Sequence, residues 1–420
     1  MRSHPLLNRA AQAGVRLGIE RVRDLLTHLG SPQDAVPSVH VGGTNGKGSV
    51  GSMIAACQSA ADKRVGLFTS PHLQEVNERI RVAGQPLPDA ELTELLEEIH
   101  ADATRWAAEH CPELPEGQPL TYFELLTVAG FVAFARNKLD LSVVEVGLGG
   151  RLDATNVMTP QVSVITTVAL DHQDRLGPDL GSIAGEKAGI IQPGVPVVVG
   201  RLPQEALRVI RLTALERGAP LHVLGEDFHP SGSHGDFVVG WADGGISEVT
   251  VGLAGAHQLD NAAVAIRALS LLPPLLRVPD GAIREGMAQV RHAGRLEWLG
   301  ERVLVDGAHN PAGATALAAA LDAMDWDQPR TLLLGASDDK DVRAIASILA
   351  PQFGRILTTH CAHDRARKAG ELAQDLVDLD IPVMPAGPIE EALPLALSEP
   401  GLVVVAGSLF TVGAARDLLG

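Results

Sequence analysis

Apolar, strand-like runs alternate with helical patterns along almost the whole of this 420-residue chain. Two of the runs, 141–146 and 162–168, are apolar and β-branched on both faces, as expected of strands buried inside a parallel sheet. Alternation of this kind is typical of successive βαβ units. It predicts an α/β fold built on mostly parallel sheets.

The chain is too long for one ordinary hydrophobic core, so we expect two domains. A second series of strands and helices begins after the polar stretch 291–296, with strands expected at 303–306, 331–334, 355–359, 382–384 and 402–406. We therefore divide the chain into residues 1–293 and 294–420 and expect a Rossmann-like second domain. Because ligands are often bound between domains, we expect the chemistry in the cleft between these two.

Charge and cysteine content narrow the class of protein. The formal net charge is −17, from 51 acidic and 34 basic residues, which argues against general binding to nucleic acid or anionic membranes. The three cysteines, Cys57, Cys111 and Cys361, form no CxxC pair, and residues 1–18 contain no long apolar segment. No run approaches the roughly 20 apolar residues of a membrane span. We expect a monomeric cytoplasmic protein without disulfides, nucleic-acid partners or a membrane anchor.

The strongest local signal is a glycine-rich loop between an expected strand and an expected helix. The loop consists of Gly43, Thr44, Asn45, Gly46, Lys47, Gly48 and Ser49. In this context backbone N–H groups surround phosphate oxygens, the helix N-terminus adds positive potential and Lys47 reaches the outer phosphates. The match to the common Walker pattern is imperfect, since Val41 replaces the first glycine and Gly48 separates Lys47 from Ser49. The alternative is a glycine-rich turn with a surface lysine.

Three polar side chains, Ser70, Glu145 and His172, follow the ends of other expected strands. Active groups of α/β folds gather at such ends, and a buried carboxylate there would be costly without a cation. Taken singly, they could be a helix cap, a paired structural glutamate and a hydrogen-bonded histidine. Three polar groups at successive strand ends favour a site.

An ordered series of motifs resembles the Mur ligase superfamily, in particular its folylpolyglutamate synthase and dihydrofolate synthase branch. The glycine-rich loop, with a glycine on each side of Lys47, is the first motif. The others, in the family's order, are 69–72 (TSPH), 145–156 (EVGLGGRLDATN), 170–172 (LDH), 186–190 (EKAGI), 257–258 (HQ) with 261–262 (NA), 294–297 (GRLE), 306–311 (DGAHNP) and 406–409 (AGSL). The resemblance covers nearly the whole chain.

The resemblance implies an ATP-dependent ligase with a P-loop domain followed by a glutamate ligase domain. Such an enzyme joins L-glutamate to the carboxylate of dihydropteroate, or to the γ-carboxylate of a folate, through an acyl phosphate. Its partners would be ATP, L-glutamate, dihydropteroate and folates. Because the two reactions share every chemical step, we predict that this single chain carries out both.

Three residues outside the loop are expected to contact ATP. The resemblance implies that Asn261 reads the adenine, that Arg295 clamps the γ-phosphate and that Asp306 lies near ribose, phosphate or the incoming glutamate. From the sequence alone, Asn261 and Arg295 could equally be surface residues, and Asp306 could belong to a turn.

The resemblance also implies two Mg²⁺ ions, hard cations that prefer oxygen ligands. Ser70 and Glu145 would hold the first ion, and Glu145 and His172 the second. Lys187 would also hold the second ion, after its amine has added CO₂ to form a carbamate. Its neighbours are apolar, and shielding lowers the pKa of a lysine, but the sequence alone favours a solvated surface lysine.

Phe123 and Asp153 are the candidates for binding a pterin. An aromatic ring can stack on it, and a carboxylate can pair with its aminopyrimidine edge. Core packing accounts for Phe123 equally well. His309 and Ser408 are expected at the substrate because they belong to the family's motifs. The expected catalytic set is Lys47, Lys187, Arg295 and His309.

Two other functions compete with this one. A Mur-type ligase acting on a UDP-linked peptidoglycan precursor would share the ATP core. Such enzymes usually carry a nucleotide-sugar domain before the P-loop, whereas only about 40 residues precede Lys47 here. A P-loop switch protein would hydrolyse ATP or GTP to control a partner, but Glu145, His172 and the long second domain speak against it.

Overall fold

The computed structural model describes residues 4–14, 16, 18–115 and 117–420. The chain forms two compact units: Met1–Gly252 with Leu259–Val290, and Leu253–Gln258 with Arg291–Gly420. The second unit thus includes the short segment Leu253–Gln258 in addition to the C-terminal part of the chain. The two units are therefore not separated by a single boundary in the sequence.

In the described residues, eight strands form the main sheet of the first unit, in the order β4-β3-β2-β5-β1-β6-β7-β8. The strands from β2 to β8 in this order are parallel, whereas β3 and β4 are antiparallel. The bounds are β1 Ser38–Gly42, β2 Val65–Phe68, β3 Ile80–Val82, β4 Gln85–Pro86, β5 Leu141–Glu145, β6 Val162–Ile165, β7 Val197–Val199 and β8 Leu221–Val223.

Two hydrophobic clusters pack against this sheet, because its central strands are buried along their whole length. One cluster joins α1, α2, α4 and α5, and the other joins α7 and α8. The helices are α1 Pro5–Gln12, α2 Glu20–His28, α3 Lys47–Ser59, α4 Asp89–His110, α5 Tyr122–Arg136, α6 Gln173–Leu176, α7 Leu180–Ala188, α8 Gln204–Glu216, α9 His257–Ser270 and α10 Asp280–Gln289, with short 3₁₀ helices at Pro32–Asp34, Val76–Arg79 and Pro274–Leu276.

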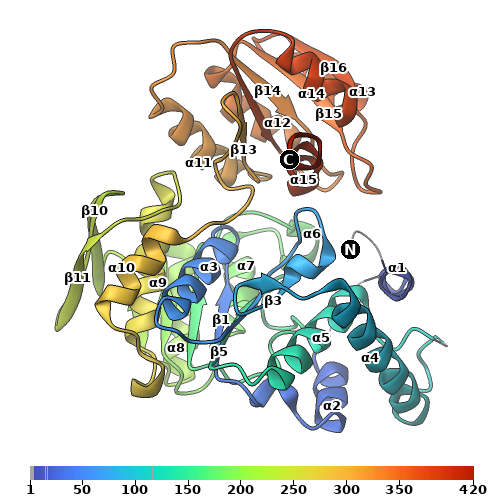
Figure 1. Ribbon diagram of the computed structural model, residues 1–420, viewed down its shortest axis with the longest axis vertical. Coiled ribbons are helices and arrows are strands. Elements are labelled where there is room, and N and C mark those ends of the chain that lie inside the picture. The colour runs from blue at the N-terminus through green and yellow to red at the C-terminus, as the bar shows by residue number, and fades with distance from the viewer. Residues whose placement is uncertain (1–3, 15, 17, 116) are drawn as a thin grey trace. The chain divides into compact units, whose positions relative to one another are not determined.

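A small antiparallel sheet extends from the first unit as a hairpin and a third strand (Figure 1). Its strands are β9 Phe228–Ser233, β10 Asp236–Trp241 and β11 Gly244–Val249. Short strands separated by turns were expected in this region.

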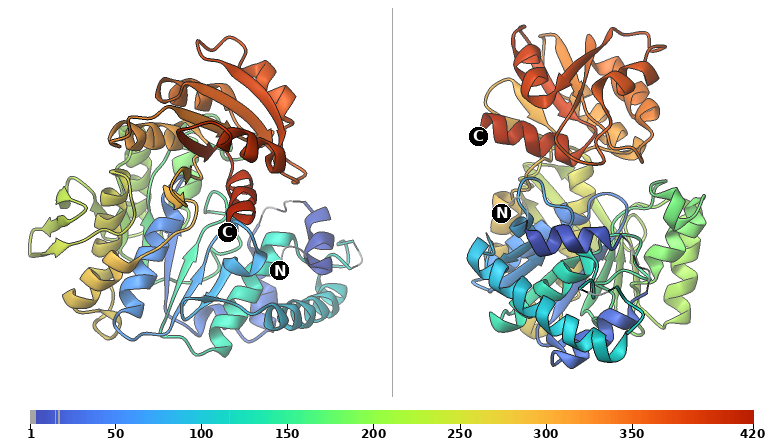
Figure 2. Two further views of the ribbon diagram at one scale, coloured as in Figure 1. Left: turned by 45° about the horizontal axis from the view of Figure 1, so that its top comes forward. Right: turned by 90° about the vertical axis from the view of Figure 1, so that its right-hand side faces the viewer.

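The second unit has a six-stranded sheet in the order β12-β13-β17-β14-β15-β16, parallel except for β12. Helices cover both of its faces (Figure 2), as expected for a Rossmann-like domain. The elements are β12 Glu297–Leu299, β13 Val303–Val305, α11 Pro311–Asp322, β14 Arg330–Leu334, α12 Val342–Leu349, the 3₁₀ helix Ala350–Gln352, β15 Arg355–His360, α13 Ala369–Asp375, β16 Val383–Pro388, α14 Ile389–Leu397, β17 Leu402–Ala406 and α15 Leu409–Leu419.

The predicted α/β architecture with mostly parallel sheets is therefore confirmed. Strand β6 is three residues shorter than predicted, because it ends at Ile165 instead of continuing to residue 168. The polar pair Thr166 and Thr167 leaves the sheet there and bonds to another loop. None of the described helices is both long enough and apolar enough to span a bilayer.

Candidate active site

The glycine-rich loop lies between β1 and α3, the position that its phosphate-binding role requires. Gly43 and Gly46 have φ angles of +140° and +86°, which side chains larger than hydrogen disfavour. A Cβ atom added at Gly43 would lie 2.0 Å from Thr166 Oγ1, so the loop has no room for one. Glycine is thus required here both by backbone conformation and by space.

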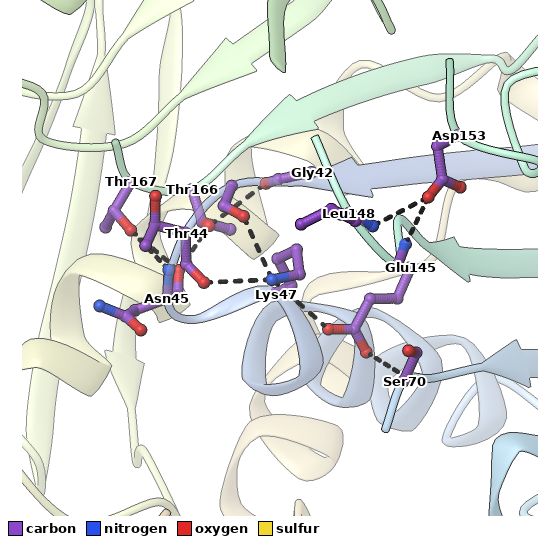
Figure 3. Close-up of polar contacts among 12 residues, drawn as sticks. Gly42, Thr44, Asn45, Lys47, Ser70, Glu145, Leu148, Asp153, Thr166 and Thr167 are labelled. Carbon is purple, nitrogen blue, oxygen red and sulfur yellow. Dashed lines mark hydrogen bonds and ion pairs between the residues drawn. The ribbon is translucent and has the colours of Figure 1, made fainter. Parts of the chain in front are cut away.

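The segment after β6 holds the loop in place. Thr44 N donates to Thr167 O over 2.8 Å, and Asn45 N donates to Thr167 Oγ1 over 2.9 Å. Thr166 Oγ1 in turn donates to Asn45 O over 2.6 Å (Figure 3). The sequence prediction missed this support, although two threonines at the end of an apolar run were the available signal.

Two lysines converge on one carbonyl oxygen of the loop. Lys47 Nζ donates to Gly43 O over 3.1 Å and to Thr44 O over 3.1 Å. Lys187 Nζ, on α7, donates to the same Gly43 O over 3.0 Å. Lys187 is buried, and burial, followed by the nearby charge of Lys47, lowers its pKa to about 7. A substantial fraction of Lys187 is therefore a neutral amine at neutral pH.

Glu145 at the end of β5 lies beside Lys47 and Ser70. Its Oε1 is 4.0 Å from Lys47 Nζ, and its Oε2 accepts from Ser70 N over 3.1 Å (Figure 3). Glu145 is buried, so its carboxylate acts in a medium of low dielectric constant. The structure therefore brings Ser70 and Glu145 together, as the strand-end argument expected, and Lys47 lies beside them.

His172 occupies the first position before α6, with the left-handed φ of +50°. Its ring Nε2 is 3.8 Å from Asp171 Oδ1, and the backbone N–H of His172 donates to the same oxygen over 2.9 Å. Within the described residues, no group of three or more His, Cys, Asp or Glu side chains could hold a metal ion. The proposed ion shared by Glu145, His172 and Lys187 therefore stays a prediction.

Asp153 organises the glycine-rich turn that follows Glu145. Its Oδ2 accepts from Gly147 N over 3.0 Å and from Leu148 N over 2.9 Å. Its Oδ1 accepts from the N–H and the hydroxyl of Thr155 over 3.0 and 2.5 Å. Burial raises the pKa of Asp153, whereas these four donors oppose that rise. Contact with a pterin therefore stays a prediction, since it would have to share or replace these bonds.

His40 on β1 extends this network beneath the loop. Its Nε2 lies 2.8 Å from Thr155 Oγ1, and burial lowers its pKa to about 3, so the ring is neutral. Because Thr155 gives its only hydroxyl proton to Asp153, His40 must donate from Nε2. The sequence analysis missed His40 and Thr155, whose roles depend on neighbours more than 100 residues away in the chain.

Phe123 is the second residue of α5 and is half-buried. A capping box formed by Thr121 and Glu124 starts the helix and so fixes the position of Phe123. Its ring meets that of Phe68 edge to face, with centroids 5.9 Å apart, and covers Gly147. Phe123 therefore packs against the hydrophobic core and also lies beside the turn that follows Glu145. Its contact with a pterin stays a prediction.

Asn261 is buried on α9 next to the loop. A Cβ atom added at Gly46 would lie 2.6 Å from Asn261 Oδ1, so the amide touches the start of α3. This contact places Asn261 close to the loop on which its predicted adenine-binding role depends.

The remaining predicted residues belong to the second unit. Asp306 is buried and accepts from Leu296 N and Ala308 N, both over 2.9 Å. Gly307 lies next to the guanidinium of Arg295, and its carbonyl oxygen is 2.8 Å from His309 Nδ1. These contacts group Arg295, Asp306 and His309 at the end of β13.

Ser408 lies at the end of β17 and caps α15 by accepting from Phe410 N over 3.2 Å. The parallel strands β13 and β17 are neighbours, so both groups lie at the same edge of this sheet.

The chain matches two family models along most of its length. Residues 41–269 match the Mur ligase middle domain, and residues 294–409 match the Mur ligase glutamate ligase domain. The dihydrofolate synthase/folylpolyglutamate synthase of Mycobacterium tuberculosis is 36% identical over 455 residues, covering 99% of this chain and 93% of that protein. The folylpolyglutamate synthase of Lacticaseibacillus casei is 38% identical over 345 residues, covering 80% and 79%.

Solved structures are similar over both units. Escherichia coli FolC in complex with DHPP and ADP has a TM-score of 0.89 at 31% identity, covering 100% of this chain and 98% of that one. A bifunctional folylpolyglutamate synthase/dihydrofolate synthase with Mn, AMPPNP and L-glutamate bound has a TM-score of 0.87 at 31% identity, covering 100% and 99%.

Proposed function

Because the chain belongs to the Mur ligase family, in its folylpolyglutamate synthase and dihydrofolate synthase branch, we propose that it joins L-glutamate to folate-type carboxylates. ATP supplies the energy, and ADP and phosphate are released. The acceptor carboxylates are that of dihydropteroate and the γ-carboxylate of folates. We further propose that one chain performs both reactions, in the cytoplasm and as a monomer. The unpaired state of Cys57, Cys111 and Cys361 supports the reducing compartment.

The convergence of two lysines on Gly43 O, beside a buried glutamate, carries this proposal. Two amino groups on one neutral acceptor repel each other once both are protonated, and a polyphosphate would relieve that repulsion. Loop N–H groups and the start of α3 add to the attraction for phosphate. The site thus suits the triphosphate of ATP.

The donor set beside the loop fits a hard divalent cation. Glu145 offers carboxylate oxygens and Ser70 a hydroxyl, and Mg²⁺ commonly takes one or two protein ligands together with phosphates and water. When bound, the cation supplies charge neutralisation for the triphosphate. His172 and a carbamate on Lys187 are the proposed ligands of a second ion.

The neutral amine of Lys187 supports the carbamate proposal, since only an uncharged amine adds CO₂. The nitrogen would bond to the carbon of CO₂ and release one proton. The product is a carboxylate in place of a cation, and it would replace the repulsion from Lys47 by attraction. Lys187→Ala should be nearly inactive, with partial rescue by formate, whereas full activity of this variant would contradict the role.

Activation of the carboxylate must precede attack by glutamate, because carboxylate oxygen is a poor leaving group and phosphate is a good one. An oxygen of the acceptor carboxylate bonds to the γ-phosphorus while the bond to the β-phosphate breaks, and ADP leaves. The amine of glutamate then attacks the acyl carbon and phosphate departs. Lys47 would stabilise the charge transferred to ADP, and its position against the loop carbonyls supports this role.

ADP release tests the proposed function most simply. We would measure it with dihydropteroate, with tetrahydrofolate and with neither, each with and without L-glutamate. The proposal requires release that depends on both an acceptor and glutamate. ATP hydrolysis indifferent to both would instead indicate a P-loop switch protein, and turnover of the folate alone would contradict the dual activity.

A further inference from the structure

Arg79 is a buried arginine that the site described so far does not use. It ends the 3₁₀ helix Val76–Arg79 and is 7% exposed. Its Nε donates to His72 Nδ1 over 2.9 Å, and its Nη1 donates to Ser70 Oγ over 3.5 Å. The guanidinium carbon lies 5.3 Å from the centroid of the Tyr122 ring. Its close contacts are therefore two neutral acceptors and an aromatic face.

No carboxylate in the described part of the chain lies within ion-pair distance of Arg79. Glu78, its neighbour in sequence, accepts instead from the backbone N–H groups of Leu73, Gln74 and Glu75. Burial lowers the pKa of Arg79, and Tyr122, Glu145 and Glu78 oppose this only through longer-range attraction. A buried cation without an adjacent anion is costly, so the site is suited to an anionic ligand.

Through Ser70, the contacts of Arg79 connect it to the phosphate loop. Ser70 N donates to Glu145, which is 4.0 Å from Lys47 on that loop. In the other direction, Tyr122 precedes Phe123, the half-buried ring that covers Gly147. Arg79 thus links the expected metal ligands to the candidate pterin-binding residues.

We propose that Arg79 binds the acceptor carboxylate that ATP phosphorylates, a role that rests on the proposed function. Lys47 and the loop N–H groups already serve the phosphates, and Lys187 is the proposed carbamate ligand of the second ion, whereas no cation has been assigned to the carboxylate. A guanidinium can donate two parallel N–H groups to one carboxylate and fix its plane. Arg79 would then orient one carboxylate oxygen towards the γ-phosphorus, and the face of Tyr122 would hold the guanidinium in place.

The test compares two ligands that differ in the negative charge of the acceptor carboxylate. Binding of dihydropteroate and of its uncharged carboxamide would be measured by calorimetry, with Mg²⁺ and a non-hydrolysable ATP analogue present. In Arg79→Gln, affinity for the acid should fall about 10- to 100-fold, while affinity for the carboxamide changes by less than about threefold. Arg79→Lys keeps the positive charge but lacks the two parallel N–H groups of the guanidinium. Its loss of affinity for the acid should therefore be smaller than that of Arg79→Gln.

Arg267 provides a matched control. Its guanidinium lies 4.9 Å from the Trp241 ring centroid and its Nη2 is 3.1 Å from His222 Nδ1, so like Arg79 it has an aromatic face and a histidine nitrogen as neighbours. Arg267→Gln should keep the wild-type ratio of acid to carboxamide affinity. Melting temperatures of all variants show which are folded, and if Arg79→Gln does not fold, the ratio in Arg79→Lys decides.

Three outcomes would overturn the assignment. An unchanged ratio in the Arg79 variants would show that Arg79 does not bind the carboxylate. Loss of affinity for the ATP analogue with an unchanged ratio would make its ligand a phosphate. Failure of the wild-type protein to bind dihydropteroate or tetrahydrofolate would remove the proposed function itself and the carboxylate with it.

Discussion

Lys187 should make the stability of this protein depend on pH in a way that its replacement removes. An unfolded lysine keeps its proton up to about pH 10.5, whereas folded Lys187 loses it near pH 7 because burial and Lys47 disfavour the charge. Between these values the unfolded state binds more protons, so the free energy of unfolding increases with pH. Lys187→Met abolishes this dependence.

The pKa values fix the size of the effect. The pKa of Lys187 differs by about 3.5 units between the unfolded state (10.5) and the folded state (about 7). At low pH, where Lys187 is protonated in both states, its charge therefore reduces the free energy of unfolding by roughly 5 kcal/mol. Between about pH 7 and pH 9, the free energy of unfolding of the wild type should increase by roughly 2 kcal/mol more than that of Lys187→Met. Loss of the hydrogen bond from Lys187 to Gly43 O shifts the free energy of unfolding of the variant by a similar amount at every pH, so it changes the pH dependence little.

Urea unfolding at a series of pH values, in metal-free and CO₂-free buffer, measures this difference. Lys368→Met replaces an exposed lysine and should follow the wild-type curve. Parallel curves for the wild type and Lys187→Met would refute the reasoning, because Lys187 would then be charged in the folded protein at neutral pH.

Three substitutions test the loop and its support. Lys47→Ala should abolish ATP turnover with an unchanged circular dichroism spectrum; turnover in this variant would exclude a phosphate role. Gly43→Ala should weaken ATP binding at least tenfold because its Cβ would lie 2.0 Å from Thr166 Oγ1, whereas Gly281→Ala, with open space around it, should bind normally. Thr155→Val leaves His40 Nε2 without its hydrogen-bond partner and removes one of the four bonds to Asp153, and it should reduce the free energy of unfolding by about 2–4 kcal/mol. A loss below about 0.5 kcal/mol would show that the network is not intact.

The sequence was sufficient for the fold because its signals are local. Strands such as Leu141–Glu145 are apolar on both faces, and a glycine-rich turn joins strand β1 to helix α3. The family resemblance then supplied the ordered motifs. Ser70 and Glu145 could be grouped because the carboxyl ends of β2 and β5 are adjacent in a parallel sheet.

Other features depend on contacts between distant segments and could not be predicted. Thr166 and Thr167 continue an apolar run, and only their bonds to Asn45 show that the strand has ended. Asp153 was chosen for its charge, but its carboxylate already accepts four bonds from its own turn. Arg79 lies in a polar stretch whose charge pattern does not reveal that the side chain is buried.

Transfer of oxygen from substrate to phosphate tests the central claim most directly. Dihydropteroate or tetrahydrofolate carrying ¹⁸O in the acceptor carboxylate would be incubated with ATP, Mg²⁺ and L-glutamate, and the released phosphate analysed by mass spectrometry. An acyl phosphate intermediate requires one ¹⁸O atom in the phosphate for each amide bond formed. Amide formation with unlabelled phosphate would contradict activation of the carboxylate by ATP.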